Sequence, residues 1–327
     1  MSNTVEMTIV KAINAGIRKA MADNDKVIVF GQDVAALGGV FRVTEGILGE
    51  FGPKRIFNSP IAEAGIVGTG IGLTMRGYRP VAEIQFDGFV FPAFNQITTQ
   101  LAKLQNRSEG AMTMPMVIRI PYGGGIGAIE HHSESPEAYF AHTPGLRVIS
   151  PSNPNDAYWM IQQAIESTDP VLFFEPKRRY WQKGMVNLDA APGGMHQARV
   201  VVPGNDVTLV AYGPMMNVAL QAAALGAEEG KSIEVIDVRS MSPIDFATII
   251  ESVKKTGRLV IAHEANTFVS VSSEIAARVA ELAFYHLEAP PLRVGGFDVP
   301  YPAAKLEEKF LPDADRILDA IDRVLAF

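Results

Sequence analysis

The chain of 327 residues contains no cysteine, which excludes disulfides, zinc–thiolate sites, iron–sulfur clusters and thiol catalysis. No apolar run approaches the roughly 18 residues of a membrane helix, and the N-terminus lacks the basic and apolar regions of a secretion signal. The formal net charge is -7, and this acidic balance disfavours binding to a phosphate backbone. We therefore expect a cytoplasmic globular protein that binds neither nucleic acid nor a membrane.

The sequence also lacks the glycine fingerprint of a dinucleotide-binding fold. The segment NSPIAEAGIVGTGIGL, residues 58–73, contains four glycines, but Leu73 stands where the third fingerprint glycine is required. Ser59-Pro60 has the form of a helix start, with a capping serine before a proline at the first helical position. We therefore place the glycines inside a helix over 60–75 and interpret one face of it as a close contact with another helix or subunit. The glycines on that face are Gly65, Gly68 and Gly72.

Short apolar, β-branched runs alternate with helical patterns along the chain, which predicts mostly parallel, doubly wound sheets. The expected strands are 27–30, 55–58, 80–84, 116–120, 147–150, 171–174, 207–212, 232–238 and 258–263. Helices are expected from 154, over 215–229, 245–255 and 270–284, and near the C-terminus. Glycine, proline and polar residues interrupt this alternation near 186–200. We expect two α/β domains, residues 1–185 and 201–327, joined by a linker over 186–200.

Two groups of side chains are candidates for chemistry. Glu63 lies in the first turn of the helix expected over 60–75, where the helix dipole alone also explains an acidic residue. The segment 120–146 has a glycine-rich start and then the run Glu130-His131-His132-Ser133-Glu134. Adjacent histidines rarely chelate one metal ion together, and no G-x-S-x-G elbow is present for a nucleophilic serine. A histidine acting as a general acid and a polar surface loop both remain open.

Several longer stretches resemble a single family, and the resemblance covers nearly the whole chain. They are VFGQDV (29–34), GGVFRVTEGIL (38–48), FNSPIAEAGIVG (57–68), RPVAEIQFDGFVFPAFNQI (79–97), HHSESPEAYFAH (131–142), PGLRVISPSNPNDAY (144–158), DPVLFFEPKRRY (169–180) and LEAPPLRVGGFDVPYP (287–302). The chain resembles the β subunit of thiamine-diphosphate-dependent 2-oxoacid dehydrogenases, the E1 component of these complexes. HHSESPEAYFAH is more similar to the branched-chain enzymes than to the pyruvate enzymes.

The resemblance implies a pyrimidine-binding domain followed by a transketolase C-terminal-like domain. It assigns Glu63 to the glutamate that hydrogen-bonds N1′ of the coenzyme's aminopyrimidine, within a site that also includes Ile61, Gln85 and Phe89. We expect Ile61, Ala64 and Ile66 to pack around Glu63. The resemblance also implies that His132 assists reductive acylation of the lipoyl group and that His131 lines the same entrance.

A cation site and two partner proteins are also implied by the resemblance. A monovalent cation, K⁺, would bind backbone carbonyls at Met116, Ala164, Ile165, Ser167 and Asp169. The chain lacks the GDG motif through which thiamine enzymes hold Mg²⁺ and the diphosphate, so an E1 α subunit would supply that half in an α2β2 heterotetramer. The E2 lipoyl acyltransferase would be the second partner. Three alternatives remain, namely a pyruvate or acetoin dehydrogenase E1 β subunit, a nicotinamide-dependent oxidoreductase and a non-catalytic scaffold subunit.

Overall fold

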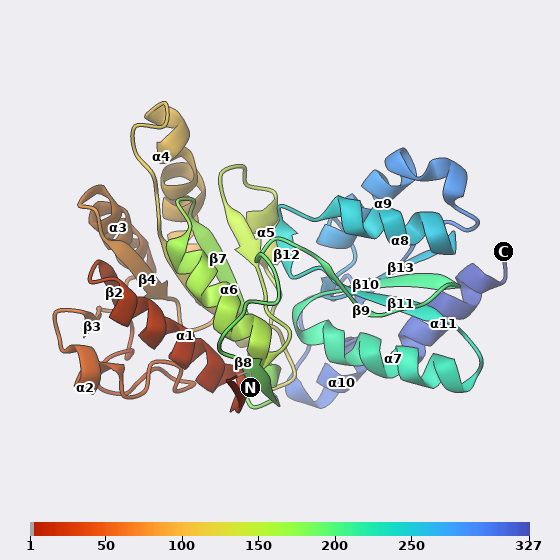
Figure 1. Cartoon of the computed structure of the whole chain (residues 1–327), viewed down its shortest axis with the longest axis horizontal. Coiled ribbons are helices and arrows are strands. Elements are labelled where there is room, and N and C mark those ends of the chain that lie inside the picture. The colour runs from red at the N-terminus through yellow and green to blue at the C-terminus, as the bar shows by residue number, and fades with distance from the viewer. Residues whose placement is uncertain (1–2) are drawn as a thin grey trace.

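A computed structural model describes residues 3–327. Figure 1 shows two α/β domains side by side, the first in red to green and the second in green to blue. Each is built on its own mostly parallel sheet, which confirms the expected fold class. All nine expected strands and the five expected helices from residue 154 onward are present, with ends shifted by a few residues at most.

The first domain surrounds a seven-stranded sheet with the order β12-β6-β7-β5-β4-β2-β3. Every neighbouring pair is parallel except β12 with β6. Because helices cover both faces, the strands read as continuous apolar runs. The strands are β2 (Val27–Gly31), β3 (Ile56–Asn58), β4 (Arg79–Glu83), β5 (Val117–Tyr122), β6 (Arg147–Ile149), β7 (Val171–Pro176) and β12 (Ser240–Ser242).

Helices on opposite faces of this sheet use alternate residues of each strand. Val27 and Val29 of β2 join the core under α1 (Ile9–Asp23) and α6 (Pro154–Glu166), which lie together in Figure 1. Ile28 of the same strand joins the core of the other face, as the two-residue period of a strand requires. That face carries α3 (Glu63–Met75), the 3₁₀ helix Asp87–Ala93, the π-helix Gln96–Leu101, α4 (Ala102–Arg107) and α5 (Glu137–Ala141), while α2 (Ile47–Phe51) lies before β3.

The second domain has a five-stranded sheet with the order β14-β13-β10-β11-β9, in which β9 alone is antiparallel. Figure 1 shows α8 and α9 on one side of this sheet and α7 and α11 on the other. The strands are β9 (Arg199–Val202), β10 (Val207–Ala211), β11 (Ile233–Asp237), β13 (Leu259–Asn266) and β14 (Leu292–Gly296). The helices are α7 (Met216–Glu228), α8 (Phe246–Thr256), α9 (Val271–Leu282), α10 (Glu307–Phe310) and α11 (Ala314–Leu325).

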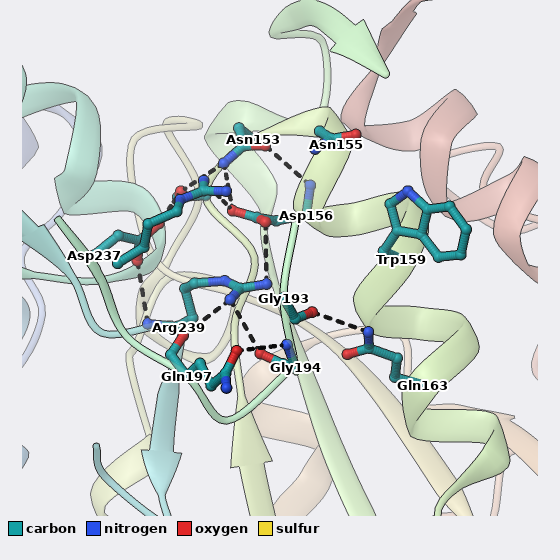
Figure 2. Close-up of polar contacts among 12 residues, drawn as sticks. Asn153, Asn155, Asp156, Trp159, Gln163, Gly193, Gly194, Gln197, Asp237 and Arg239 are labelled. Carbon is teal, nitrogen blue, oxygen red and sulfur yellow. Dashed lines mark hydrogen bonds and ion pairs between the residues drawn. The ribbon is translucent and has the colours of Figure 1, made fainter. Parts of the chain in front are cut away.

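The segment expected to be a linker, 186–200, is held firmly against the first domain. Its two ends belong to β8 (Lys183–Asn187), which pairs with β1 (Thr4–Thr8), and to β9. Figure 2 shows Arg239 bonded to the segment between them, where it donates to the carbonyls of Gly194 (3.1 Å) and Gln197 (2.9 Å). Arg239 also pairs with the buried Asp156 of α6 at 3.1 Å. These polar contacts explain why a stretch of loop composition is ordered.

The helix expected over 60–75 begins later than its sequence indicates. The helix α3 starts at Glu63, and Ser59 and Pro60 precede it in a strand-to-helix connection. The N–H of Ser59 donates to the carbonyl of Gly31 at 2.8 Å, which continues the pairing of β3 with β2. A strand-like hydrogen bond therefore replaces the predicted cap at Ser59.

The glycine face of α3 is open within residues 3–327. Apart from the adjoining residues and the backbone of α3 itself, a Cβ added at Gly68 or Gly72 would have no heavy atom of residues 3–327 within 4 Å. Therefore no helix in the described part of the chain crosses α3 at those positions, and the contact with another subunit stays a prediction. Among the described residues, no helix is long and apolar enough to cross a membrane.

Candidate active site

The candidate residues follow the carboxyl ends of adjacent strands in the order β3-β2-β4-β5. The last residues of β2, β3 and β4 are paired with one another, because Gly31 is in register with both Asn58 and Glu83. Open α/β sheets bind ligands at this edge. Gln32 follows β2, Glu63 follows β3, Gln85 to Phe89 follow β4, and His131 and His132 follow β5.

Glu63 is a buried carboxylate with one protein partner. It is the first residue of α3 and is only 9% exposed. Nε2 of the buried Gln32 donates to its Oε1 at 3.0 Å. Its Oε2 has no hydrogen-bond partner within residues 3–327. The N-terminus of a helix stabilises negative charge, so the site holds a carboxylate in a fixed orientation with one oxygen available to a ligand.

The expected packing around Glu63 is only partly correct. Ile66 is buried in the core, but Ile61 is 83% exposed and Ala64 is also exposed. The reason is the later helix start, which leaves Ile61 in the connection before α3 rather than on its inner face. Instead of Ile61 and Ala64, Gln32, which follows the neighbouring strand β2, contacts the Glu63 side chain. A place for Ile61 in a coenzyme site stays a prediction.

The ring of His132 is held between aromatic side chains. Phe86 stacks on it with ring centroids 4.0 Å apart, and Phe89 meets it edge-on at 5.1 Å. His131 lies edge-on to His132 at 4.4 Å. The Nδ1 atom of His132 is buried and has no hydrogen-bond partner in the described part of the chain. Because an unpaired buried nitrogen is unfavourable, this arrangement fits a polar group contributed by a ligand or a second subunit.

A buried ion pair fixes the loop that carries the histidines. Lys177, just after β7, pairs with Asp87, and both side chains are fully buried. Lys177 Nζ also donates to the carbonyl of His132 at 2.6 Å, and Asp87 Oδ2 accepts the N–H of Glu134 at 2.9 Å. Burial raises the pKa of Asp87 and lowers the pKa of Lys177, while their mutual attraction opposes both shifts. A Cβ on Gly88 would lie 2.4 Å from the carbonyl oxygen of His131, so only glycine permits this close approach.

The glycine-rich loop before the histidines is held by the second domain. The N–H groups of Gly125 and Gly127 donate to the two carboxylate oxygens of Glu307, at 2.7 Å and 2.9 Å. The hydroxyl of Tyr301 donates to the same carboxylate at 2.6 Å, and Glu264 of β13 accepts a further loop N–H. A loop that the sequence indicates as pliable is therefore fixed by carboxylates distant in sequence.

Comparison with known proteins identifies the family of this fold and site. The family Transketolase, pyrimidine binding domain matches residues 5–182, and Transketolase, C-terminal domain matches residues 196–317. The chain is 63% identical over 321 residues to the pyruvate dehydrogenase E1 component subunit beta of Leifsonia xyli subsp. xyli, covering 98% of this chain and 95% of the relative. It is 50% identical over 323 residues to the 3-methyl-2-oxobutanoate dehydrogenase subunit beta of Mycobacterium tuberculosis, covering 98% and 93%. The chain belongs to the E1 β-subunit family of 2-oxoacid dehydrogenases.

Further comparisons agree with this family and this fold. The 2-oxoisovalerate dehydrogenase subunit beta of Pseudomonas aeruginosa is 43% identical over 338 residues, covering 98% of this chain and 95% of the relative. A solved structure titled split gene transketolase, inactive beta4 tetramer, superposes with a TM-score of 0.79 at 24% identity and covers 98% of both chains. That likeness concerns the fold alone. Because the chain belongs to the E1 family, the alternative interpretation as a nicotinamide-dependent oxidoreductase is wrong.

The carbonyls expected to bind a monovalent cation in this β subunit do not fit a free cation site. Arg79 Nη1 donates to the carbonyls of Ile165 and Ser167. The other three carbonyls also accept hydrogen bonds, that of Met116 from the N–H of Val171, that of Ala164 from the N–H of Ser167, and that of Asp169 from Ser167 Oγ. A K⁺ ion would have to displace a positively charged group.

The candidate site contains four residues that the sequence analysis did not name. The structure also shows where two residues that it did name, Gln85 and Phe89, are located. Gln85 Nε2 donates to Asp33 at 3.2 Å, and Phe89 is partly buried beside the histidines. The missed residues are Gln32, Asp87, Lys177 and Glu307. Gln32, Asp87 and Lys177 lie inside the stretches VFGQDV, RPVAEIQFDGFVFPAFNQI and DPVLFFEPKRRY, which carried the resemblance, and so a signal for them was present.

Proposed function

We propose that this β subunit binds the aminopyrimidine half of thiamine diphosphate and, together with an E1 α subunit, catalyses oxidative decarboxylation of a 2-oxoacid. The same active site then transfers the acyl group to the lipoyl group of E2. The observation that carries this proposal is the buried carboxylate of Glu63, oriented by Gln32 at 3.0 Å at the carboxyl edge of the sheet.

Each of these residues has a defined task in the proposed site. When bound, thiamine diphosphate would supply the nucleophilic chemistry that decarboxylation of a 2-oxoacid requires. Glu63 would hold the pyrimidine ring by accepting a hydrogen bond from its N1′ through the unpaired Oε2, and this would favour the imino form of the ring. Gln32 keeps that carboxylate in one orientation, so that little reorganisation is needed during the reaction. Phe89 would offer an apolar ring to the cofactor, and Gln85 and Ile61 would complete the cofactor contacts.

His132 is the proposed acid for lipoyl acylation. A histidine can deliver a proton near neutral pH, and the reduced lipoyl sulfur requires one. Phe86 and Phe89 fix the imidazole ring, and Lys177 holds its backbone carbonyl. His131, packed edge-on against His132, lines the same entrance.

The missing half of the site requires a partner. The sequence has no GDG motif, so we assign Mg²⁺ and the diphosphate to the α subunit of a cytoplasmic α2β2 heterotetramer, with E2 lipoyl acyltransferase as the next partner. The open glycine face of α3 is the candidate contact for another subunit.

Two 2-oxoacids are candidates for the substrate. The stretch HHSESPEAYFAH favours a branched-chain 2-oxoacid such as 2-oxoisovalerate. Pyruvate is the second candidate, because the relative that is 63% identical is named a pyruvate dehydrogenase subunit. Acetoin, a hydroxyketone and not a 2-oxoacid, is the alternative substrate. Comparing kcat/KM of the co-expressed α–β pair on pyruvate, 2-oxoisovalerate and acetoin decides among them.

The role of Glu63 is tested by Glu63→Gln in the assembled α–β enzyme. We expect decarboxylation, measured with an artificial electron acceptor, to fall by about 10²–10⁴-fold, as when a group that positions a catalytic proton is lost. Assembly, measured by size-exclusion chromatography, should not change. Glu228→Gln on the exposed surface of α7 is the matched control and should retain full activity. Turnover of Glu63→Gln near the wild-type level would show that the role given to Glu63 is wrong.

A further inference from the structure

Arg79 lies where one helix ends against the first sheet. It is the first residue of β4, and its Nη1 atom donates to the carbonyl of Ile165 at 2.7 Å and to that of Ser167 at 2.9 Å. Ile165 is in the last turn of α6 and Ser167 is its C-terminal cap. The last carbonyls of a helix have no partner within the helix and carry partial negative charge. This helix end is therefore a position that favours a cation.

We propose that the guanidinium of Arg79 is the resident cation of this position and that this β subunit needs no monovalent metal ion there. Carbonyl oxygens bind K⁺ by replacing its hydration shell, which requires oxygens that point at the ion and are free to do so. Here Arg79 donates to two of the five carbonyls, so its positive charge already lies against their oxygens. The other three carbonyls each accept one hydrogen bond within the chain. A metal ion entering the site would have to compete with Arg79 for the oxygens of Ile165 and Ser167 and would meet its positive charge.

The charged groups around the position agree with this assignment. The carboxylate of Asp169, which could otherwise attract a metal ion, is bound by Arg147, whose Nε and Nη2 atoms lie 2.9 Å and 2.6 Å from Oδ2. The N–H of Met114 donates to the carbonyl of Thr168 at 3.1 Å, which closes the loop between α6 and β7. Both acidic and carbonyl groups of this loop are therefore paired within the chain.

The position of the guanidinium also predicts what its loss would do. Arg79 ties the C-terminal end of α6 to the amino end of β4, while Glu63, His131 and His132 lie at the carboxyl end of the same sheet. The inference concerns the stability of the subunit and is independent of the substrate and of the role proposed for Glu63. Its test therefore has unfolding temperature as the readout, and a failure of the proposed function would not affect it.

The experiment compares the α–β complex in KCl, NaCl and tetramethylammonium chloride at equal ionic strength. The wild-type protein should unfold at the same temperature in all three salts. Arg79→Ala should unfold about 4 °C lower in tetramethylammonium chloride, because two hydrogen bonds from a charged group are lost. KCl should restore part of that loss in Arg79→Ala, because the vacated carbonyls then accept the ion.

Two further variants keep the test decisive. Arg79→Lys retains a positive charge and should keep the wild-type indifference to the salt, even where Arg79→Ala fails to fold. Arg76→Ala removes an exposed arginine at the end of α3 and should show no salt-specific effect. A wild-type protein stabilised by KCl relative to tetramethylammonium, an Arg79→Lys variant that requires KCl, or an Arg79→Ala variant with equal unfolding temperatures in all three salts would overturn the proposal.

Discussion

The ion pair of Lys177 and Asp87 offers a direct test of how the histidine loop is held. Lys177→Met keeps a long side chain and removes the ammonium group. The variant loses the pair with Asp87 and the bond from Nζ to the carbonyl of His132, which is 2.6 Å long. Asp87 then remains fully buried, with the N–H of Glu134 at 2.9 Å as its remaining donor from the loop.

The expected loss of unfolding free energy in Lys177→Met follows from the burial of both Lys177 and Asp87. Removing one member of a buried pair leaves an uncompensated charge and typically costs about 3–5 kcal/mol of unfolding free energy. Burial raises the pKa of Asp87 in the folded protein above the usual range of an aspartate. A folded-state pKa above the unfolded value gives stability that is present below the unfolded pKa and is lost as the pH rises through the folded pKa. The deficit of Lys177→Met should therefore be smallest in acid and should grow toward neutral pH.

Denaturant unfolding of the α–β complex at several pH values measures this deficit. The double variant Asp87→Asn/Lys177→Met removes both charges and should be more stable at neutral pH than Lys177→Met alone. Lys183→Met is the matched control, because Lys183 is 69% exposed and its pair with Glu6 is 3.6 Å long, so its cost should stay below about 1 kcal/mol. Lipoyl acylation should fall more than decarboxylation in Lys177→Met, since the loosened loop carries His132.

Two results would refute this reasoning. The first is a Lys177→Met variant that unfolds like the wild type at neutral pH, which would mean that Asp87 does not depend on Lys177. The second is a double variant no more stable than the single one, which would locate the loss in packing rather than in the unpaired charge.

Three further predictions concern other parts of the subunit. Gln32→Leu should lower kcat of decarboxylation by about 10–100-fold, since it removes a hydrogen bond to a charged group, and an unchanged kcat would exclude Gln32 as a positioning residue. Burial raises the pKa of Glu137 to about 8, so its contribution to stability is present in acid and is lost as the pH rises through 8. Glu137→Gln should therefore flatten the pH dependence of unfolding free energy between about pH 5 and pH 8, and denaturant titrations with an unchanged slope would contradict this. Gly68→Leu should leave the β chain folded, because nothing lies within 4 Å of an added Cβ, but should weaken subunit assembly in size-exclusion chromatography. Normal assembly of that variant would exclude the glycine face as a contact.

Local pattern was sufficient for most of the fold. The apolar runs at 27–30 and 171–174 became β2 and β7, because buried parallel strands are recognisable as continuous apolar segments. The helix expected from 154 is present as α6, and the side chain of Asn153, just before Pro154, caps it by accepting the N–H of Asp156 at 3.0 Å. Ser59-Pro60 has a similar form, yet there the pairing of β3 with β2 takes precedence over the cap.

The sequence by itself determined most of the strands and helices, their order, and which two groups of side chains are candidates for chemistry, because periodicity and caps act over a few residues. The tertiary structure alone decided which groups meet. Gln32 reaches Glu63, Lys177 reaches the loop of His132, and Glu307 binds the glycine loop from 180 or more residues away in the chain. Arg79 likewise meets the end of α6 only because β4 lies beside it. Such contacts depend on strand order and on the packing of two domains, and no local pattern contains that information.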